Sequence, residues 1–516
     1  MMEKRELAEQ KVSKKKKKKK KKKINPIVFK IIAFLLIIIS VITIVYTVIE
    51  EIIDLYTLIP YILIGFVIVT IITLILSSRL RNWVKVLFSI ITFLIIAAEI
   101  VFMIYGVSTF KFLNQITDTG LRVETYGIYV KNNSPFKSIK ELDNRKVAYL
   151  YIPNDIETKD AIDKTIDDNN VNLKLESIDT LEDLLTSVND GDTNAIFMNT
   201  SYEAVAEEEY GGSIHNLKCI YTIDMVNYVK TTKSNKKITK DTYAIYISGI
   251  DTSGKVASKA RSDVNIIMIV NPRTYQVLLI NTPRDYYVDL ASNNKKDKLT
   301  HAGLSGIEES SNTLAKLYDI DIDYYLRINF TSFVKIINSL GGINVNVSKA
   351  FCEQDSKRNF DNQICLRKGT QNLNGEQALA YARHRHTLPQ GDISRGENQM
   401  EIIKAIINKA ASPAIIKNYT SLIAALTGNI VTNMETDEMY EVAKYQLSKN
   451  PTWNISSITA TGTSALKPCY ALGNANASVV IPDEVSILGI KNAIKNIYTD
   501  KKDIIVEEKT TTKTNN

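Results

Sequence analysis

Three long apolar runs near the start of the chain dominate its hydrophobic pattern. They extend from about Pro26 to Val48, from Leu58 to Leu76 and from Val84 to Tyr105. Each is close to the ~20 residues that an α-helix needs to cross a lipid bilayer. A cleaved signal peptide has a single short apolar core, so it does not account for three successive runs. The pattern therefore predicts three transmembrane helices within residues 24–107.

Basic residues beside these runs predict their orientation. An unbroken series of ten lysines, Lys14 to Lys23, precedes the first run. The loop between the second and third runs is basic as well, with Arg79, Arg81 and Lys85. Positively charged flanks stay on the cytoplasmic side of a membrane. We therefore expect a cytoplasmic lysine-rich tail over residues 1–23 and an extracellular remainder after about Tyr105.

The net charge of +8 is local to the same tail. Removing the ten lysines of Lys14–Lys23 leaves −2 for the rest of the chain. Broad positive surfaces are typical of nucleic-acid-binding proteins, so we expect no nucleic-acid partner. We interpret the lysines as a topology signal rather than as a binding site for acidic lipids. Glu99 lies within the third apolar run; its position near the outer end favours a structural or neutral role over a functional one.

The extracellular part divides into two regions with different patterns. Residues 119–230 predict a small α/β accessory domain, with strands at Lys146–Ile152 and Asn194–Met198 and helices at Ile162–Asp168 and Leu181–Val188. This region contains no phosphate-binding loop, metal cluster or constellation of residues that would activate a nucleophile. It either binds a glycan or a partner, or acts as a spacer, and the sequence does not distinguish these roles. A polar linker, Thr231–Lys237, follows it.

The second domain is predicted over residues 241–500. Its strands are apolar throughout rather than alternating, which is typical of a sheet covered by helices on both faces. Ligands of such sheets bind beyond the strand ends. Residues 501–516 are charged and rich in threonine, so we expect a disordered tail. The expected strands are Ala244–Ile250, Val264–Val270, Val277–Asn281 and Asn454–Thr459, and the expected helices are Gly306–Tyr318, Phe330–Leu340, Asn418–Ala425 and Thr436–Gln446.

Two aspartates follow and precede neighbouring strands of this domain. Asp251 ends the first strand, and Asp263 begins the second after a loop rich in Ser, Gly and Lys. Each residue taken alone is as well explained by a helix cap or a turn. Together they supply the carboxylate oxygens that Mg²⁺ prefers. We therefore expect Asp251 and Asp263 to form a magnesium site that is completed by a ligand.

Five arginines accompany this aspartate pair at expected strand ends and in a later segment. Guanidinium groups bind phosphate oxygens in a bidentate manner. Ordinary surface ion pairs are the alternative for each arginine alone. In combination with the carboxylates and the membrane spans, they predict a site for a lipid-linked diphosphate. The arginines are Arg261, Arg284, Arg383, Arg385 and Arg395.

The segment around Arg383 and Arg385 is expected to be a strand, because the two arginines would then share one face. His384 and His386 would face the other way, where packing or solvation is favoured over catalysis.

Asp392, Arg395 and Gln399 have the spacing of one helix face. Asp392 is alternatively the N-cap of that helix.

These motifs together resemble the LytR–CpsA–Psr family of cell-envelope glycopolymer transferases. The similar segment extends from Asp241 to about Pro413, and more weakly to Asp483. The three apolar runs and the additional outer domain resemble its capsule-type branch. The matching pieces are Gly249–Asp251, Arg261–Asp263, Pro283–Asp285, Asp297–Ala302, Asn374–Arg385 and Asp392–Gln399.

The resemblance implies an α/β/α sandwich with a hydrophobic tunnel for a polyprenyl chain. It implies that Asp251 and Asp263 hold Mg²⁺, that the five arginines bind the diphosphate, and that Lys298 and Gln399 support them. Apolar residues of Ile328–Ile343 are candidates for the tunnel, and ordinary core packing is an equal alternative. One departure is Asn398, which stands where many relatives have a further arginine.

The implied activity is a membrane-anchored phosphotransferase that moves a glycopolymer, capsule or teichoic acid, from polyprenyl diphosphate to a hydroxyl of peptidoglycan. The catalytic set would be Asp251, Asp263, Arg284 and Asp285, and any of the three aspartates could take the acceptor proton. A polyprenyl-diphosphate phosphatase and a non-enzymatic membrane sensor or transcriptional attenuator are the alternatives.

Four cysteines complete the pattern, and their spacing excludes a C-x-x-C zinc site. Cys352 and Cys365 are expected to form a disulfide outside the cell. A second bridge between Cys219 and Cys469 is the less favoured possibility.

Overall fold

The computed structural model separates into two compact units, Met1–Phe110 and Lys111–Asn516. The structure describes residues 26–49, 64–65, 67–68, 70–72, 81–116, 121–152, 155–228, 234–252, 256, 259–356, 362–388, 392–412, 415–426 and 429–505.

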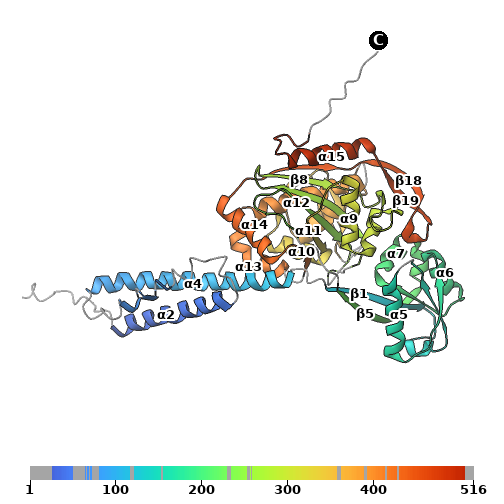
Figure 1. The fold of residues 1–516 in the computed structure, drawn as a ribbon, viewed down its shortest axis with the longest axis horizontal. Helices are drawn as coiled ribbons and strands as arrows, with labels where there is room; N and C mark the ends of the chain where they lie inside the picture. The colour runs from blue at the N-terminus through green and yellow to red at the C-terminus, as the bar shows by residue number, and fades with distance from the viewer. Residues whose placement is uncertain are drawn as a thin grey trace, which may run out of the picture. The chain divides into compact units, whose positions relative to one another are not determined.

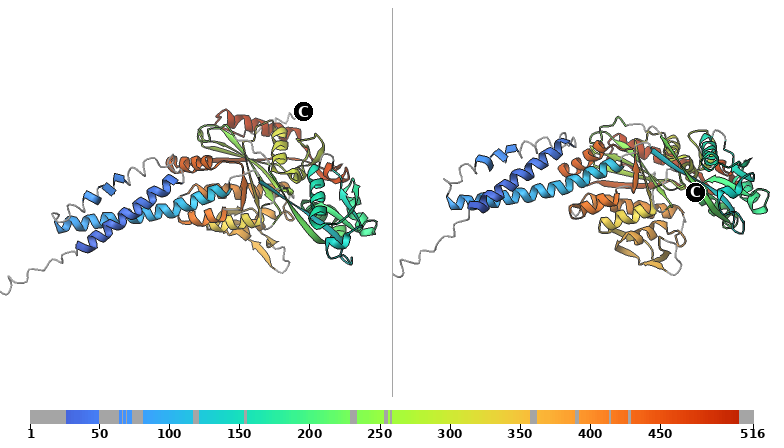
Figure 2. Two further views of the ribbon diagram at one scale, coloured as in Figure 1. Left: turned by 60° about the horizontal axis from the view of Figure 1, so that its bottom comes forward. Right: turned by 90° about the horizontal axis from the view of Figure 1, so that it is seen from below.

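The first unit contains two long apolar helices, α2 (Pro26–Ile49) and α4 (Asn82–Ile116). Figure 2 shows them side by side. Ser40 of α2 donates a hydrogen bond of 2.7 Å to the buried carboxylate of Glu99 on α4, which agrees with the structural role expected for Glu99. The lysine tail and most of the second apolar run lie outside the described residues. Within the described part, one helical stretch, Trp83–Val101, is long and apolar enough to cross a membrane.

The accessory domain contains a five-stranded sheet with the order β3-β2-β4-β1-β5. Strand β1 runs antiparallel to β4 and β5, whereas β2 is parallel to β3 and β4. The expected strands and helices of this region are confirmed. The elements are β1 (Leu121–Lys131), η3 (Ile139–Leu142), β2 (Lys146–Leu150), α5 (Ile156–Asn169), β3 (Lys174–Ile178), α6 (Leu181–Asp190), β4 (Ala195–Asn199), η4 (Thr200–Tyr202), α7 (Glu203–Ile214) and β5 (Leu217–Tyr228).

The second domain is built on a six-stranded mixed sheet with the order β16-β11-β6-β7-β8-β17. The β6–β11 and β8–β17 pairs are parallel, and the other neighbouring pairs are antiparallel. The strands are β6 (Tyr243–Ile250), β7 (Ser262–Asn271), β8 (Gln276–Asn281), β11 (Tyr324–Asn329), β16 (Ile430–Thr432) and β17 (Asn454–Thr459).

Both faces of this sheet are apolar, which explains why its strands do not alternate. On β6, for example, Tyr246 packs into a core cluster with α9 (Ile307–Tyr318) and α15 (Glu484–Tyr498), whereas Ile247 packs into a cluster on the opposite face. That opposite face is covered by α12 (Asp392–Ala410). Figure 1 shows α15 and α12 on opposite sides of β8. The expected sheet with helices on both faces is therefore observed.

The remaining elements of the domain are short hairpins and helices around the sheet. The expected Cys352–Cys365 disulfide joins β13 to β14, whereas Cys219 and Cys469 are not bonded to each other. The elements are β9 (Tyr287–Asp289), β10 (Lys296–Lys298), α8 (Leu299–Ala302), η5 (Gly303–Ser305), α10 (Phe330–Ser339), β12 (Ile343–Val347), β13 (Phe351–Gln354), β14 (Gln363–Leu366), β15 (Gly369–Leu373), α11 (Gly375–Arg383), α13 (Ile415–Leu426), α14 (Thr436–Lys449), β18 (Gly462–Pro468), η6 (Tyr470–Leu472) and β19 (Asn476–Pro482).

Candidate active site

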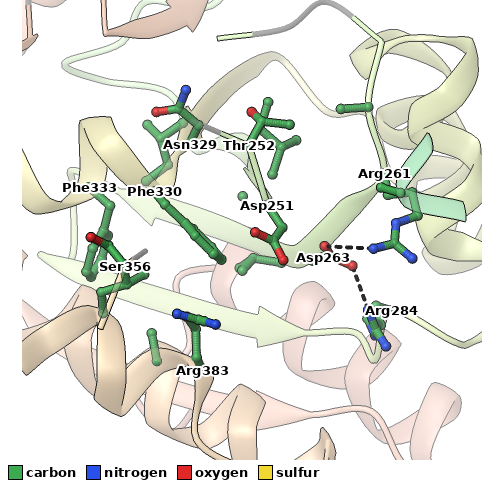
Figure 3. Close-up of a pocket in the computed structure, with 18 of the residues that line it drawn as sticks. Asp251, Thr252, Arg261, Asp263, Arg284, Asn329, Phe330, Phe333, Ser356 and Arg383 are labelled. Atoms are coloured by element: carbon green, nitrogen blue, oxygen red, sulfur yellow. Dashed lines mark hydrogen bonds and ion pairs between the residues drawn. The ribbon is translucent and has the colours of Figure 1, made fainter. Parts of the chain in front are cut away.

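A cavity with a volume of 1220 Å³ lies at the ends of β6, β7 and β11. Its lining combines a charged part with an apolar part (Figure 3). The charged part contains both expected metal-binding carboxylates and all five expected arginines, namely Asp251, Asp263, Arg261, Arg284, Arg383, Arg385 and Arg395. The structure therefore brings into one cavity side chains that are up to 144 positions apart in the sequence, between Asp251 and Arg395.

A β-bulge determines how Asp263 enters the cavity. Gly249 pairs with Val264, but the next residue, Ile250, pairs with Ser262, so Asp263 is the extra residue of the bulge. Bulges re-aim side chains and are common beside active sites. Gly249 permits the close approach of the two strands, because a Cβ atom there would lie 2.8 Å from the Cβ atom of Val264. Figure 3 shows the carboxylates of Asp251 and Asp263 directed toward the same space.

Two guanidinium groups surround Asp263. Arg284 Nη1 donates to its Oδ1 atom at 2.9 Å, and Arg261 Nη2 lies 4.0 Å from its Oδ2 atom. Burial acts to raise the pKa of Asp263, but the charges of Arg284 and Arg261 together outweigh burial and hold this pKa below its ordinary value. Asp263 therefore remains a carboxylate, which is the form that accepts arginine bonds or binds a metal.

Arg383 and Arg385 line the cavity, but the expected strand is wrong. Arg383 is the last residue of helix α11, and Arg385 lies in the loop that follows. A capping box between Asn374 and Gln377 begins this helix, and alanines with high helix propensity continue it. Arg383 Nη1 donates to the carbonyl of Asp355 at 3.1 Å, and its guanidinium lies 5.2 Å from the ring centroid of Phe330. The helix end, rather than a strand face, places Arg383 in the cavity.

The two histidines of this segment have different positions. His384 is buried, stacks on Phe351 and bonds to Glu353 and Thr387, in agreement with a packing role. His386 lines the cavity instead of facing away from it.

The expected helix of Asp392, Arg395 and Gln399 is confirmed as α12. Arg395 and Gln399 both line the cavity, and Gln399 Nε2 donates to the carbonyl of Ala382 at 3.2 Å. Asp392 begins the helix, but its side chain lies outside the described residues. Asn398 is buried and bonded to the carbonyl of Tyr381, so this family departure serves to pack α12 against α11.

Lys298 and Asp285 do not belong to the lining of the cavity. Lys298 is buried, and its Nζ atom lies 3.9 Å from Asp285 Oδ1. Asp285 Oδ2 in turn lies 3.7 Å from the Nε atom of Arg284. Asp285 is therefore adjacent to both Arg284 and Lys298, outside the lining of the cavity.

Two of the segments that contribute apolar side chains to the lining bear on the expected tunnel. Ile328, Phe330 and Phe333 come from the segment that was expected to line a tunnel. Helix α12 adds three isoleucines that were not expected, because their helical spacing is equally typical of ordinary core residues. They are Ile402, Ile403 and Ile406.

A carboxylate from the accessory domain was also missed. Glu208 of α7 lines the cavity and forms ion pairs with both Arg261 and Arg284. The run Glu207-Glu208-Glu209 was visible in the sequence. However, nothing in the sequence connected this run with arginines more than 50 residues away.

The donor set of the cavity fits Mg²⁺ only together with a ligand. Among the described residues, no group of three or more His, Cys, Asp or Glu side chains is arranged to hold a metal ion by itself. Asp251 and Asp263 supply two carboxylates in the same cavity. Mg²⁺ is commonly held by one or two carboxylates, with substrate phosphates and water as the other ligands.

A comparison with protein families matches residues 217–496 of the chain to the LytR_cpsA_psr family. Two curated relatives are named as polyisoprenyl-teichoic acid–peptidoglycan teichoic acid transferase TagU. The one from Enterococcus faecalis is 35% identical over 207 residues, which cover 40% of this chain and 65% of the relative. The one from Bacillus subtilis is 32% identical over 217 residues, which cover 41% of this chain and 68% of the relative.

The crystal structure of B. subtilis TagV is 28% identical to the matched part, with a TM-score of 0.42, and the match covers 51% of this chain and 99% of that chain. The match to the first curated relative, TagU of Bacillus licheniformis, spans 63% of the length of that protein.

Proposed function

Because this chain belongs to the LytR–CpsA–Psr family, we propose that it is a phosphotransferase that moves a glycopolymer from a polyprenyl diphosphate to a hydroxyl group of peptidoglycan. The names of the TagU relatives describe a transfer of this kind, with teichoic acid as the polymer. The single observation that carries the proposal is the composition of the cavity. Arginines and carboxylates suited to a diphosphate and its metal border apolar side chains suited to a lipid chain.

The proposed reaction forms one bond and breaks one bond at the same phosphorus. The acceptor hydroxyl oxygen attacks the phosphorus that carries the glycopolymer. The bond from this phosphorus to the bridging oxygen breaks, and polyprenyl monophosphate leaves. The product is a phosphodiester between the glycopolymer and peptidoglycan, and the hydroxyl proton passes to a base or to the leaving phosphate.

Phosphoryl transfer of this kind needs positioning and charge neutralisation more than covalent help from the protein. Arg261, Arg284, Arg383, Arg385 and Arg395 would bind the phosphate oxygens. Asp251 and Asp263 would hold Mg²⁺, which would add further positive charge at the same oxygens.

We assign the acceptor proton to no single aspartate. Asp251 and Asp263 line the cavity, and Asp285 does not. This geometry favours the first two as proton acceptors and gives Asp285 the role of orienting Arg284.

The proposal includes attachment to the membrane. The apolar stretch Trp83–Val101 and the helix α2 are the segments that support it. A multi-pass topology with the second domain outside the cell would bring the cavity to the leaflet where lipid-linked polymers are presented. Cysteine labelling from outside intact cells tests this orientation, with Lys14→Cys or Lys295→Cys introduced into a protein that carries Cys219→Ser and Cys469→Ser. Labelling of the Lys295→Cys protein alone is expected.

Transfer by the purified full-length protein tests the reaction. The assay contains Mg²⁺, a synthetic glycopolymer on polyprenyl diphosphate, and peptidoglycan fragments. For Arg383→Ala we expect a fall in transfer rate of about 10²- to 10³-fold, by analogy with the loss of one stabilising donor. Arg367→Ala is the matched control, because Arg367 is exposed and does not line the cavity.

Other outcomes of this assay would replace the proposal. Release of free phosphorylated polymer, with no product linked to peptidoglycan, would identify a phosphatase. Full transfer by a variant that carries both Arg383→Ala and Arg385→Ala would show that these two arginines do not take part in the reaction. This result would favour a non-enzymatic sensor.

A further inference from the structure

The cavity arginines are in contact with a carboxylate of the accessory domain. Glu208 Oε2 pairs with Arg261 Nη1 and lies 3.4 Å from Arg284 Nη1, and Glu208 Oε1 pairs with Arg284 Nη2. One carboxylate thus bridges two guanidinium groups. The side chains of Arg261 and Arg284 are only 10% and 9% exposed, so this is a largely desolvated contact.

Helix α7 is held in this position by apolar packing. Leu184 of α6 belongs to the same buried cluster as Val205 of α7 and as Leu304 and Leu472 of the second domain. The cluster therefore crosses from the accessory domain to the second domain. Burial of large apolar side chains is the main stabilising contribution at such contacts. The apolar packing of α7 therefore fixes the backbone of Glu208 beside the two arginines.

Further ion pairs surround this contact with the same polarity. Lys298 of the second domain pairs with Glu209, the neighbour of Glu208. Lys259 pairs with Glu124 of β1 at 2.9 Å and with Glu157 of α5. In each pair the cation comes from the second domain and the carboxylate from the accessory domain. The accessory domain therefore presents an acidic edge to the cationic border of the cavity.

A donor diphosphate needs the same guanidinium groups. A carboxylate and a phosphate both bind an arginine through two parallel N–H···O bonds. The N–H donors of Arg261 and Arg284 that bind Glu208 are then not available for phosphate oxygens. Glu208 and the diphosphate of the lipid-linked substrate therefore compete for the same N–H groups of Arg261 and Arg284.

We propose that Glu208 is an internal competitor of the donor: it neutralises Arg261 and Arg284 in the ligand-free protein and is displaced when a polyprenyl diphosphate binds. This inference rests on the proposed function, because it assigns those two arginines to the diphosphate. The accessory domain would thereby set the affinity of the site for its donor.

The partial exposure of the Glu208 side chain permits this displacement. Glu208 is 32% exposed, so its carboxylate can rotate into solvent while the buried residues of α7 stay in place. Burial acts to raise the pKa of Glu208, but the charges of Arg284 and Arg261 outweigh it and hold this pKa below its ordinary value. The carboxylate is therefore charged and repels an incoming phosphate until it moves away.

Competition of this kind lowers the affinity of the site for simple anions such as inorganic phosphate. Every anion that uses both arginines must displace Glu208, and this requirement lowers its apparent affinity. A lipid-linked donor gains additional free energy from the apolar lining of the cavity, whereas inorganic phosphate does not. We therefore expect the site to stay free of inorganic phosphate at concentrations at which the donor binds.

Binding of geranyl diphosphate to the full-length protein in detergent tests the inference by calorimetry. Glu208→Gln keeps the shape of the side chain but removes the charge. We expect it to bind the probe about 10-fold or more tightly, because the fraction of protein with available arginines increases. Glu182→Gln is the charge-matched control, since Glu182 is exposed on α6 of the same domain, and its affinity should equal that of the wild type.

A second measurement needs no variant. Carbodiimide-driven labelling of carboxylates, read by mass spectrometry, should show Glu208 protected in the free wild-type protein and several-fold more reactive with geranyl diphosphate bound, while Glu182 stays constant. Equal or weaker probe binding by Glu208→Gln, or Glu208 labelling that does not rise, overturns the inference and leaves the proposed function intact. If neither wild type nor Glu208→Gln binds the probe, the proposed function fails and this inference fails with it.

Discussion

Asp263 illustrates how the surroundings of one residue decide its chemistry. Taken alone, a buried carboxylate tends to be protonated. Here two guanidinium groups reverse that tendency, and Thr300 adds a weak hydrogen bond at 3.4 Å. Asp263 therefore interacts with two guanidinium groups and a hydroxyl group of the protein, whereas Asp251 directly follows the last residue of β6 and lines the same cavity. The two aspartates are expected to contribute differently when a metal binds.

Asp251→Asn should weaken metal binding without breaking the contact between Asp263 and Arg284. We expect a loss of Mn²⁺ affinity of about 10-fold or more in the presence of geranyl diphosphate, since even outer partners of metal ligands contribute 10- to 100-fold. Electron paramagnetic resonance of free Mn²⁺ measures this directly. Asp289→Asn on β9 is the control, because Asp289 is paired with Lys296 at a distance of 3.0 Å on the surface. Equal Mn²⁺ affinity in Asp251→Asn and wild type would remove Asp251 from the metal site.

At the scale of elements, the packing of α12 against the sheet determines where two of the cavity side chains lie. The helix carries Arg395 and Gln399 into the cavity and packs across the end of β8. Gly396 permits this close approach: a Cβ atom there would lie 1.9 Å from Nδ2 of Asn281, and Asn281 is buried. The glycine between the functional residues therefore serves the distance between helix and sheet.

Gly396→Ala should force α12 away from β8. Overpacking of this kind costs about 1–3 kcal/mol, and it should also reduce transfer because Arg395 moves with the helix. Gly489→Ala on α15 is the matched control: no atom lies within 4 Å of the position that its Cβ would take, so we expect no loss of stability. Thermal unfolding followed by intrinsic fluorescence compares the two variants. A Gly396→Ala protein as stable and active as the control would contradict this account of α12.

The sequence predicted elements well where local rules act. The apolar strands β6, β7 and β8 and the helix face of Arg395 and Gln399 follow from periodicity, and all are present. The strand predicted at Arg383 is wrong for a local reason too. The spacing of two between Arg383 and Arg385 favours a strand, but the capping box at Asn374 begins a helix that continues to Arg383. The bulge that re-aims Asp263 could not be predicted, since it depends on the register of two paired strands.

At the scale of the whole second unit, the contact between the accessory domain and the second domain could not be predicted from sequence patterns. Glu124 and Lys259 are 135 positions apart, and neither lies in a motif. Their pairing depends on how the two domains pack against each other. A single sequence contains the charges but not this packing, so the role of the accessory domain stayed open between a binding domain and a spacer.

Lys259→Met tests whether the two domains form one structural unit. The Glu124 side chain is 3% exposed, and removal of its cation leaves a buried carboxylate without that partner. We expect a loss of about 1–3 kcal/mol, the cost of an uncompensated buried polar group. The double variant Lys259→Met with Glu124→Gln should recover most of this loss, because no charge remains buried. Lys164→Met, which breaks an exposed pair with Asp168, should change stability by less than about 0.5 kcal/mol.

The loss should also depend on pH in a defined direction. Burial raises the pKa of Glu124 above its ordinary value, and Lys259 opposes this rise, so the pKa of Glu124 should be higher still in Lys259→Met. A carboxyl group with a raised pKa in the folded state destabilises the protein as pH rises through that pKa. The stability difference between Lys259→Met and wild type should therefore be larger at pH 8 than at pH 5. A difference that grows toward low pH, or additive losses in the double variant, would show that Glu124 and Lys259 do not stabilise each other across the domain contact.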